Sequence, residues 1–382
     1  MLISLIIAIS SPFVLSFFVR STRSLSPSSE NLHIVPSIHS ELQSKEEKAE
    51  CSKQTSEQKI EKIDDVPEGS VAHSSSSSSQ LGTCGTWKQN GLTVAGGHGY
   101  GNQLNQLNGP RGIYVDDDRQ CFYVADSENH RIVKWEYGAE IGQVVAGGNG
   151  QGNSMNQLDR PINVIVDHKT DSLIVCDQGN VRVVRWSCQH SPSGETIIKH
   201  VPCNGLTMDN NGDLYVSDWS KGDVRRWKIG EKEGTLVAGG NGIGRKLNQL
   251  NSPASLFVDR EYSIYVSDSM NNRVVKWVKG AKEGIVVAGG QGDGSKLTQL
   301  SYPRGVTIDH LGNVYVADLH NHRIICWSNG SLEGRTIVGG NGKGQGANQF
   351  HRVTDLSFNR QGNLYVVDIG NDRVQKFEID LK

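Results

Sequence analysis

The sequence carries little excess charge of either sign, and this limits the functions open to it. Its 382 residues include 39 Lys and Arg against 41 Asp and Glu, for a formal net charge of −2. The acidic excess falls in residues 24–83, so the C-terminal part of the chain is close to neutral. A domain that binds nucleic acid through its phosphates usually shows a marked basic excess. We therefore do not expect nucleic acid to be the partner.

Signatures of cysteine chemistry and of common catalytic sites are also missing. The cysteine count is odd, the spacing is irregular and no Cys-x-x-Cys occurs, so the pattern predicts no disulfide framework, zinc ribbon or thioredoxin-type site. We expect Cys176 to be a small core residue, and Cys188 and Cys203 to lie on opposite faces of the fold. The chain has neither a Walker loop nor a serine nucleophile elbow. The seven cysteines are Cys51, Cys84, Cys121, Cys176, Cys188, Cys203 and Cys326.

One long hydrophobic run stands at the N-terminus. Residues 2–19 are uncharged and long enough for a transmembrane helix or the core of a signal peptide, so residues 1–23 are predicted to be one or the other. The absence of basic residues before the run and of an Ala-x-Ala site after it favours an uncleaved anchor. Arg20 and Arg23 favour a cytoplasmic C-terminal side, whereas the glycosylation acceptor Asn329 favours a lumenal one. We expect a single-pass membrane-anchored or secreted protein and leave its orientation open.

Residues 24–83 differ in composition from the rest of the chain. They are rich in Ser, Glu and Lys, include the serine run 74–79 and contain few large apolar residues. Such a segment cannot bury enough apolar surface to offset its conformational entropy. We predict a disordered linker here, followed by a folded domain at 84–382.

A glycine-rich string occurs at the start of several repeats in the C-terminal domain. The copy at Gly147 reads GGNGQGNSMNQL. A phosphate site would need such a loop to open a helix, but this one leads into the strand-like INVIVD after Pro161. The string also occurs five times, which one bound nucleotide would not require. We interpret its glycines as positive-φ turn residues between repeats. The copies start at Gly96, Gly147, Gly239, Gly289 and Gly339.

A second string, of the type VYVADLHNHRIICW, recurs six times at intervals of 41 to 51 residues. Each interval contains four short segments rich in Val, Ile, Tyr or Trp and bounded by turn residues, which predicts four antiparallel strands. Repeats of this size with four strands are typical of propeller blades. The sixth repeat lacks its fourth strand, and GLTVAGG at 91–97 supplies one from the other end. The sequence thus predicts an all-β, six-bladed β-propeller closed by its N-terminal strand.

The repeated motif resembles the NHL repeat family. It reads Pro-x-Gly-Val-x-x-Asp, then Val-Tyr-Val-Ala-Asp, then Asn-x-Arg-Ile/Val-x-x-Trp, and the resemblance covers roughly residues 91–382. It implies a six-bladed propeller. The second repeat departs from the pattern because no glycine-rich loop follows Trp186, and the third has Asp223 where the others have arginine.

Residues that recur in every repeat are expected to be scaffold. The aspartate at the end of each second strand can accept hydrogen bonds from the following turn and pair with the arginine five positions later. The strand aromatics, such as Trp135 and Trp327, are expected to pack between blades. Residues that break the repeat on the face carrying the glycine-rich loops are the better candidates for binding. They are His98, Arg111, His130, Asn149, Asn241, Gln291, Arg304, His322, Asn341, His351 and Asp355.

Several of these candidates are histidines in the fifth, sixth and first repeats, which are neighbours in a closed ring. Histidines can ligate a metal, and His130, His320 and His322 are the candidate ligands. Amidating lyases of similar fold use a zinc held by histidines. Gluconolactonase-like propellers hold calcium with a glutamate on an inner strand, and no inner strand here contains one. We therefore expect no resident cofactor, with zinc or calcium as the alternatives.

The preferred interpretation is a monomeric, non-enzymatic binding module that docks a protein, peptide or glycan on its loop face. The first alternative is a metal-dependent lyase or hydrolase using the histidines. The second, implied by the resemblance, is an adaptor in ubiquitin ligation or an RNA-binding domain, as in tripartite-motif proteins. No RING or B-box precedes the repeats, which counts against this second alternative.

Overall fold

The computed structural model describes residues 83–189, 192–228 and 230–380. All of them belong to one compact unit, Ser74–Lys382. Among these residues, no helix has the length and apolar character needed to cross a bilayer. The predicted anchor at 1–23 and nearly all of the predicted linker at 24–83 lie outside the described residues.

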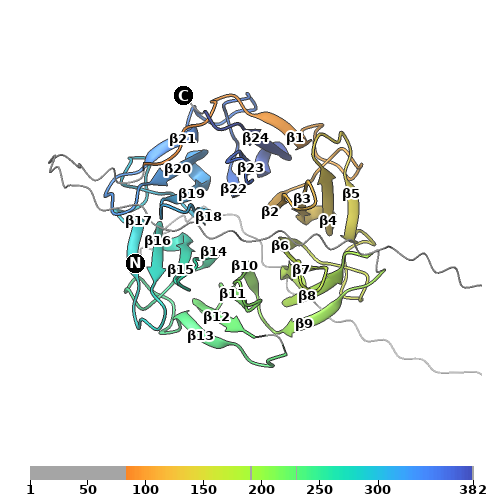
Figure 1. The fold of residues 1–382 in the computed structure, drawn as a ribbon, viewed down its shortest axis with the longest axis horizontal. Helices are drawn as coiled ribbons and strands as arrows, with labels where there is room; N and C mark the ends of the chain where they lie inside the picture. Colours follow the sequence, from red (N-terminus) through yellow and green to blue (C-terminus); the bar gives the residue numbers. More distant parts are fainter. Residues whose placement is uncertain (1–82, 190–191, 229, 381–382) are drawn as a thin grey trace, which may run out of the picture. The chain divides into compact units, whose positions relative to one another are not determined.

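Six four-stranded antiparallel sheets are arranged as blades around a central axis (Figure 1), which confirms the predicted propeller. Blade 1 contains β2 (Pro110–Asp116), β3 (Cys121–Asp126), β4 (Arg131–Glu136) and β5 (Gln143–Gly147). Blade 2 contains β6 (Pro161–Asp167), β7 (Ser172–Asp177), β8 (Arg182–Ser187) and β9 (Glu195–Lys199). Blade 3 contains β10 (Cys203–Met208), β11 (Leu214–Asp218), β12 (Asp223–Trp227) and β13 (Thr235–Gly239).

The remaining blades repeat this order, and the first strand of each blade is the innermost. Blade 4 contains β14 (Pro253–Val258), β15 (Ile264–Asp268), β16 (Arg273–Trp277) and β17 (Ile285–Gly289). Blade 5 contains β18 (Pro303–Ile308), β19 (Val314–Asp318), β20 (Arg323–Trp327) and β21 (Arg335–Gly339). Blade 6 contains β22 (Val353–Phe358), β23 (Leu364–Asp368), β24 (Arg373–Phe377) and β1 (Leu92–Gly96).

The hydrophobic core lies between neighbouring blades. Tyr123 of β3, Val164 of β6 and Trp186 of β8 belong to one cluster that joins blades 1 and 2. Trp135 and Trp327 are 1% exposed, so these strand aromatics are packing residues as predicted. Each blade is thus stabilised mainly by burying apolar surface against its two neighbours.

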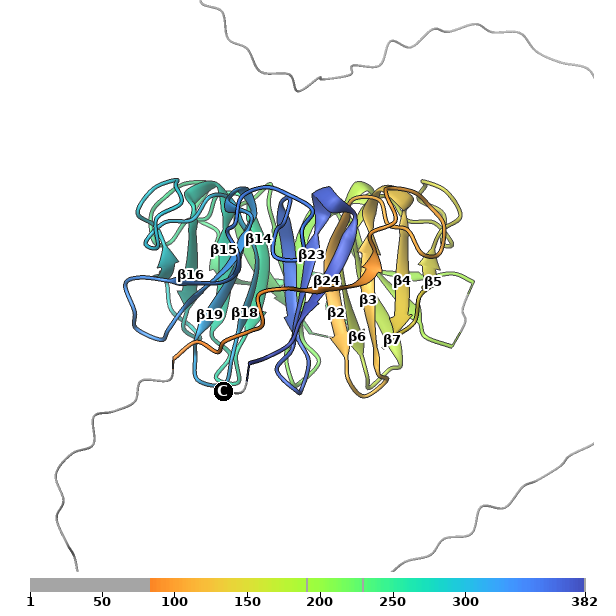
Figure 2. The same ribbon diagram turned by 90° about the horizontal axis from the view of Figure 1, so that it is seen from above.

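The connections divide between two faces of the disc (Figure 2). The face that carries the glycine-rich inter-blade loops also carries the turns between second and third strands, and we call it the loop face. In five blades this turn is a short 3₁₀ helix followed by a left-handed residue, such as His130 at φ 54°. The 3₁₀ helices are η1 (Ser127–Asn129), η2 (Gln178–Asn180), η3 (Ser269–Asn271), η4 (Leu319–Asn321) and η5 (Ile369–Asn371).

A buried aspartate–arginine pair holds the loop that precedes each of five blades. In blade 5, Arg323 Nε donates to Asp318 Oδ2 at 2.8 Å, and the rest of the guanidinium donates to three carbonyls of the preceding loop. Asp318 Oδ1 accepts the backbone N–H of Ser301 at the end of that loop. The predicted scaffold role of this pair is confirmed. The five pairs are Asp126–Arg131, Asp177–Arg182, Asp268–Arg273, Asp318–Arg323 and Asp368–Arg373.

Blade 3 lacks this pair because the loop before it is missing. Only residues 200–202 separate β9 from β10, so there are no loop carbonyls for an arginine to hold. Asp223 stands in the arginine position and pairs instead with Arg225, at 3.0 Å. A disulfide between Cys176 of β7 and Cys203 of β10 joins the two blades at this junction. At this junction a disulfide therefore replaces the glycine-rich loop and the aspartate–arginine pair that holds it in the other blades.

The ring is closed by the N-terminal segment, as predicted. β1 pairs antiparallel with β24, and Trp87 is 5% exposed between the rings of Tyr315 and Phe358. Trp87 Nε1 also donates to Gly362 O at 2.8 Å. A second disulfide, Cys84–Cys326, ties the start of this segment to blade 5.

The two disulfides correct the prediction of no disulfide framework. Cys84 and Cys326 are 242 residues apart in the sequence, and only ring closure brings them together. Cys176 is buried, as expected, but it is cross-linked rather than a free core residue. Within the described residues Cys121 and Cys188 remain free thiols, and Cys188 does not pair with Cys203.

Candidate functional site

Two of the predicted histidines have structural partners on the loop face. His130 Nδ1 accepts the backbone N–H of Arg160 in the next blade at 3.1 Å, and His322 Nδ1 accepts that of Arg352 at 3.0 Å. Asn272 makes the equivalent contact with the backbone N–H of Tyr302. The left-handed turn residue therefore joins one blade to the next, and these two Nδ1 atoms are already in use as acceptors. Burial lowers the pKa of His322, which agrees with a neutral ring in this position.

The other predicted histidines do not form one cluster with these two. His351 lies beside His322, with ring centroids 6.2 Å apart, but its Nδ1 contacts Gly370 O in its own blade at 3.1 Å. His320 stacks on Tyr302, and His98 is exposed in a glycine-rich loop. The structure therefore disperses the histidines among separate local contacts.

The predicted ring of amides in the glycine-rich loops braces those loops. The side-chain amides of Asn149, Asn241 and Asn341 each donate to a carbonyl seven residues later, at 2.9 to 3.1 Å. Gln291, at the equivalent position, contributes its backbone carbonyl to Gln299. These residues are exposed, but three of the amides are committed to their own loops.

The structure brings Arg111, Arg304 and Asp355 together at the loop-face ends of the innermost strands. Pro110 and Pro303, which precede the two arginines, pair with the strand-end aspartates on that face. Arg304 of blade 5 donates to Asn204 Oδ1 of blade 3 at 3.2 Å, which is a contact across an intervening blade. Its guanidinium lies 5.9 Å from the Tyr302 ring centroid. We call Arg111, Asn204, Tyr302, Arg304 and Asp355 the axial cluster.

The two arginines of the axial cluster are half-buried, and no carboxylate of the described residues lies within ion-pairing distance of either. Burial lowers the pKa of both guanidiniums, and the charge of Arg111 lowers the pKa of Arg304 further. Desolvation and a like charge both act against the ionised form. The cluster therefore concentrates positive charge that the protein itself leaves without a paired anion.

Asp355 is an acid whose charge acts on Arg304, and its position is set by the neighbouring strands. It is 7% exposed and accepts the backbone N–H of Ile113 at 3.0 Å through Oδ2. A Cβ atom on Gly305 would lie 2.7 Å from Asp355 Oδ1, so blade 5 needs glycine there. Burial raises the pKa of Asp355 to about 7, although Arg304 and the backbone donors oppose this. Near neutral pH it is thus partly protonated and does not fully neutralise the arginines.

Sequence reasoning missed Tyr302 and Asn204. Tyr302 precedes the proline of β18 at φ 55°, and its ring stacks on His320 with centroids 5.3 Å apart. Asn204 aligns with Arg111 and Arg304 on the inner strands, and its Nδ2 donates to Pro253 O. The signal was present in the sequence, because both residues lie at positions that differ from blade to blade.

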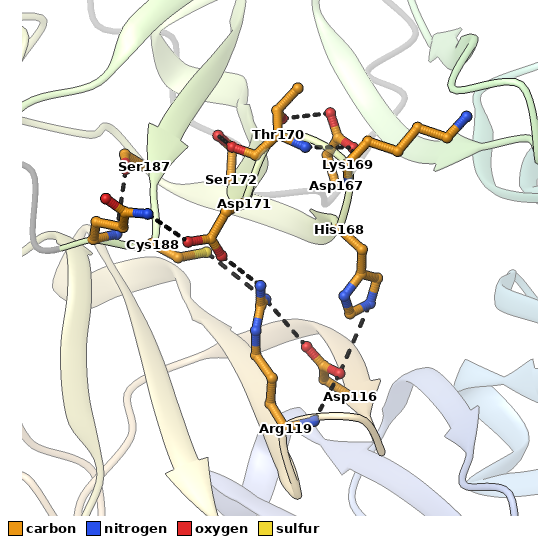
Figure 3. Close-up of polar contacts among 11 residues, drawn as sticks. Asp116, Arg119, Asp167, His168, Lys169, Thr170, Asp171, Ser172, Ser187 and Cys188 are labelled. Carbon is orange, nitrogen blue, oxygen red and sulfur yellow. Dashed lines mark hydrogen bonds and ion pairs between the residues drawn. The ribbon is translucent and has the colours of Figure 1, made fainter. Parts of the chain in front are cut away.

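The opposite face holds a separate polar cluster between blades 1 and 2 (Figure 3). Arg119 bridges Asp116 and Asp171, at 3.3 and 2.5 Å, and its Nη1 lies 3.9 Å from the Cys188 sulfur. Asp116, Asp118 and His168 form the one group of possible metal ligands found among the described residues, and it includes none of the predicted histidines. Arg119 already supplies a cation to Asp116, which argues against a further cation there.

Solved structures with a similar fold have various descriptions. An auxiliary nutrient binding protein from Bacteroides thetaiotaomicron is 17% identical, with a TM-score of 0.62, over 77% of each chain. A protein of unknown function from the same organism is 16% identical, with a TM-score of 0.61, over 77% of this chain and 76% of the other. A gluconolactonase from Xanthomonas campestris is 12% identical, with a TM-score of 0.55, over 79% of this chain and 99% of the other. At these identities the likeness shows the fold alone. No curated protein matches the chain in sequence.

The family comparison agrees with the repeats seen in the structure. The model described as NHL repeat matches residues 107–135 and 300–327. These segments cover the start of blades 1 and 5, including both axial arginines and the second and third strands of each blade. The described domain is therefore a six-bladed β-propeller whose first and fifth blades match the NHL repeat.

Proposed function

We propose that this propeller is a binding module that docks a protein, peptide or glycan partner on its loop face, centred on the axial cluster. The observation that carries the proposal is the asymmetry of the innermost strands. The aspartate–arginine pairs recur in five blades and are fully used within the scaffold. Arg111, Arg304 and Asp355 break that regularity and lie where the blades converge.

A metal-dependent enzyme is supported less well by the geometry. Two candidate histidines use Nδ1 to join adjacent blades, and a third stacks on Tyr302. A histidine-held zinc needs several ring nitrogens directed at one point. The binding module requires no such convergence, so we favour it.

Partner capture with full-length variants tests the proposal. Tyr302→Ala removes an aromatic side chain from the axial cluster and keeps the backbone bond to Asn272. We expect it to reduce the captured partner at least tenfold, because aromatic anchors often dominate binding. Tyr262→Ala is the matched control, since Tyr262 is also a half-buried tyrosine with positive φ but lies in an opposite-face turn. Equal loss in both variants, or loss only with Tyr262→Ala, would place docking elsewhere.

We also propose that the propeller lies in an oxidising compartment or outside the cell. Two disulfides are typical of such environments, and reducing cytosol disfavours them. Asn329, in the Asn-Gly-Ser acceptor, is exposed in the turn between β20 and β21 on the opposite face. A glycan there would leave the loop face free for a partner.

This location predicts a defined pattern of modification. Alkylation of the denatured, unreduced protein should label at most three of the seven cysteines, because four are cross-linked. Enzymatic removal of N-glycans should lower the mass of the protein but leave an Asn329→Gln variant unchanged. Labelling of all seven cysteines together with no change in mass would instead indicate a cytosolic propeller.

A further inference from the structure

Two sets of arginines in the propeller differ in their partners. Five of them, one in each blade except blade 3, donate to a buried aspartate at 2.7 to 2.8 Å and to backbone carbonyls. Arg111 and Arg304 are half-buried without a carboxylate partner, and Arg304 has one neutral acceptor in Asn204. The same fold therefore satisfies its scaffold arginines and leaves the two axial ones available.

An unpaired guanidinium that is partly removed from water is unfavourable unless an anion is bound at least part of the time. Two such groups close enough to affect each other add repulsion to this desolvation. A carboxylate placed between them would form charge-assisted hydrogen bonds with both planar forks. Tyr302 and Asn204 supply a flat ring and a neutral amide at the same place, which suits the uncharged part of a ligand.

We infer that the axial cluster recognises a ligand through a carboxylate held between Arg111 and Arg304, which assigns a ligand class to the proposed loop-face site and rests on that proposal. A single monoanionic group fits the surroundings better than a polyanion. Asp355 and Glu128 lie near the two arginines, and a more highly charged group would be repelled by them. The near-neutral charge of the domain gives no additional attraction for nucleic acid.

Titration of the arginine side chains tests this assignment directly. The full-length protein is titrated with succinate, with its neutral diamide succinamide and with inorganic phosphate, while the Nε–H signals of Arg111 and Arg304 are followed by NMR. We expect saturable shifts with succinate, none with succinamide and weaker binding of phosphate. Arg304→Gln should weaken succinate binding at least tenfold, because it removes a charge-assisted hydrogen bond to the carboxylate. Arg260→Gln, an exposed opposite-face charge, is the matched control.

Each result decides a separate point. Equal binding of succinamide, no saturable binding of succinate, or equal weakening by Arg260→Gln would overturn the carboxylate site. Tighter binding of phosphate would overturn the choice of carboxylate. If succinate fails to bind while Tyr302→Ala still abolishes partner capture, the ligand class is wrong and loop-face docking stands. If succinate binds and Tyr302→Ala captures as much partner as the wild type, the proposal of loop-face docking is wrong and the anion site stands.

The pH dependence supplies a second readout. Asp355 faces Arg304 of β18 and accepts the backbone N–H of Ile113 in β2. The other titratable groups around the cluster are Arg111, Arg160, Tyr302, Glu128 and His320. Burial lowers the pKa of His320, which favours its neutral ring over this pH range. Ionisation of Asp355 adds a negative charge beside the bound carboxylate, so succinate affinity should fall at least threefold between about pH 6.5 and pH 8. Asp355→Asn should remove this fall, whereas an unchanged slope would contradict the assignment.

Discussion

Deletion of residues 84–97 is expected to open the ring and produce an unstable, aggregating protein. The deletion removes β1 and leaves β24 as an unpaired edge, which is a template for association with other chains. It also removes Trp87 and the disulfide Cys84–Cys326. Loss of one buried Trp usually costs about 3–5 kcal/mol, and loss of a disulfide about 2–4 kcal/mol. Together these losses are comparable to the whole stability of a typical domain.

Thermal unfolding and size-exclusion chromatography measure this effect. Deletion of residues 24–73, within the predicted linker, is the matched control and should leave the melting temperature of the propeller unchanged. Trp87→Ala keeps the strand and the disulfide, and should lower the free energy of unfolding by about 3–5 kcal/mol. A monomeric 84–97 deletion that melts at the wild-type temperature would show that the ring closes without this segment.

Asp318→Ala is expected to destabilise the propeller by about 3–5 kcal/mol, because it removes one partner of a buried ion pair. Asp318 is 0% exposed and accepts from the backbone of Ser301 and from the side chains of Asn321 and Arg323. The substitution leaves Arg323 buried beside its loop carbonyls with no counter-charge. Chemical denaturation of the variant measures the loss.

Asp218→Ala is the control for this substitution. Asp218 is the equivalent residue of blade 3, where Asp223 replaces the arginine, so no buried guanidinium is left behind. Asp218 accepts hydrogen bonds from Ser220 and Lys221 in the turn, and we expect a cost of about 1–2 kcal/mol. Equal losses in the free energy of unfolding for Asp218→Ala and Asp318→Ala would mean that the ion pair with Arg323 does not stabilise the propeller.

Much of the fold could be predicted from the sequence, because a propeller repeats the same four-stranded blade and its sequence motif. The spacing of the strand-end aspartates predicts the blades, and the missing last strand predicts closure by 91–97. The disulfides were not predicted, since the odd cysteine count conceals two pairs, and ring closure alone brings Cys84 to Cys326. Cys176 and Cys203 could have been paired from their places on adjacent blades, next to the one missing glycine-rich loop.

The site was harder to predict, since a repeat motif does not show which side chains are already used. Asn149 and His130 look available in the sequence, yet both hold loop backbone in place. Arg111 and Arg304 were identified from the sequence because the other four blades have no arginine at the equivalent position. Asn204 and Tyr302 also differ from blade to blade, but the structure is needed to show that Asn204 of blade 3 contacts Arg304 of blade 5.

Hydrogen exchange of the propeller with and without its captured partner tests the central claim most directly. If the repeat-breaking residues of the loop face form the binding site, the partner should protect segments 107–114, 300–306 and 351–356. The opposite-face turns at 259–263 and 309–313 should exchange as in the free protein. Protection of those opposite-face turns, with no change at the loop-face ends of the inner strands, would contradict it.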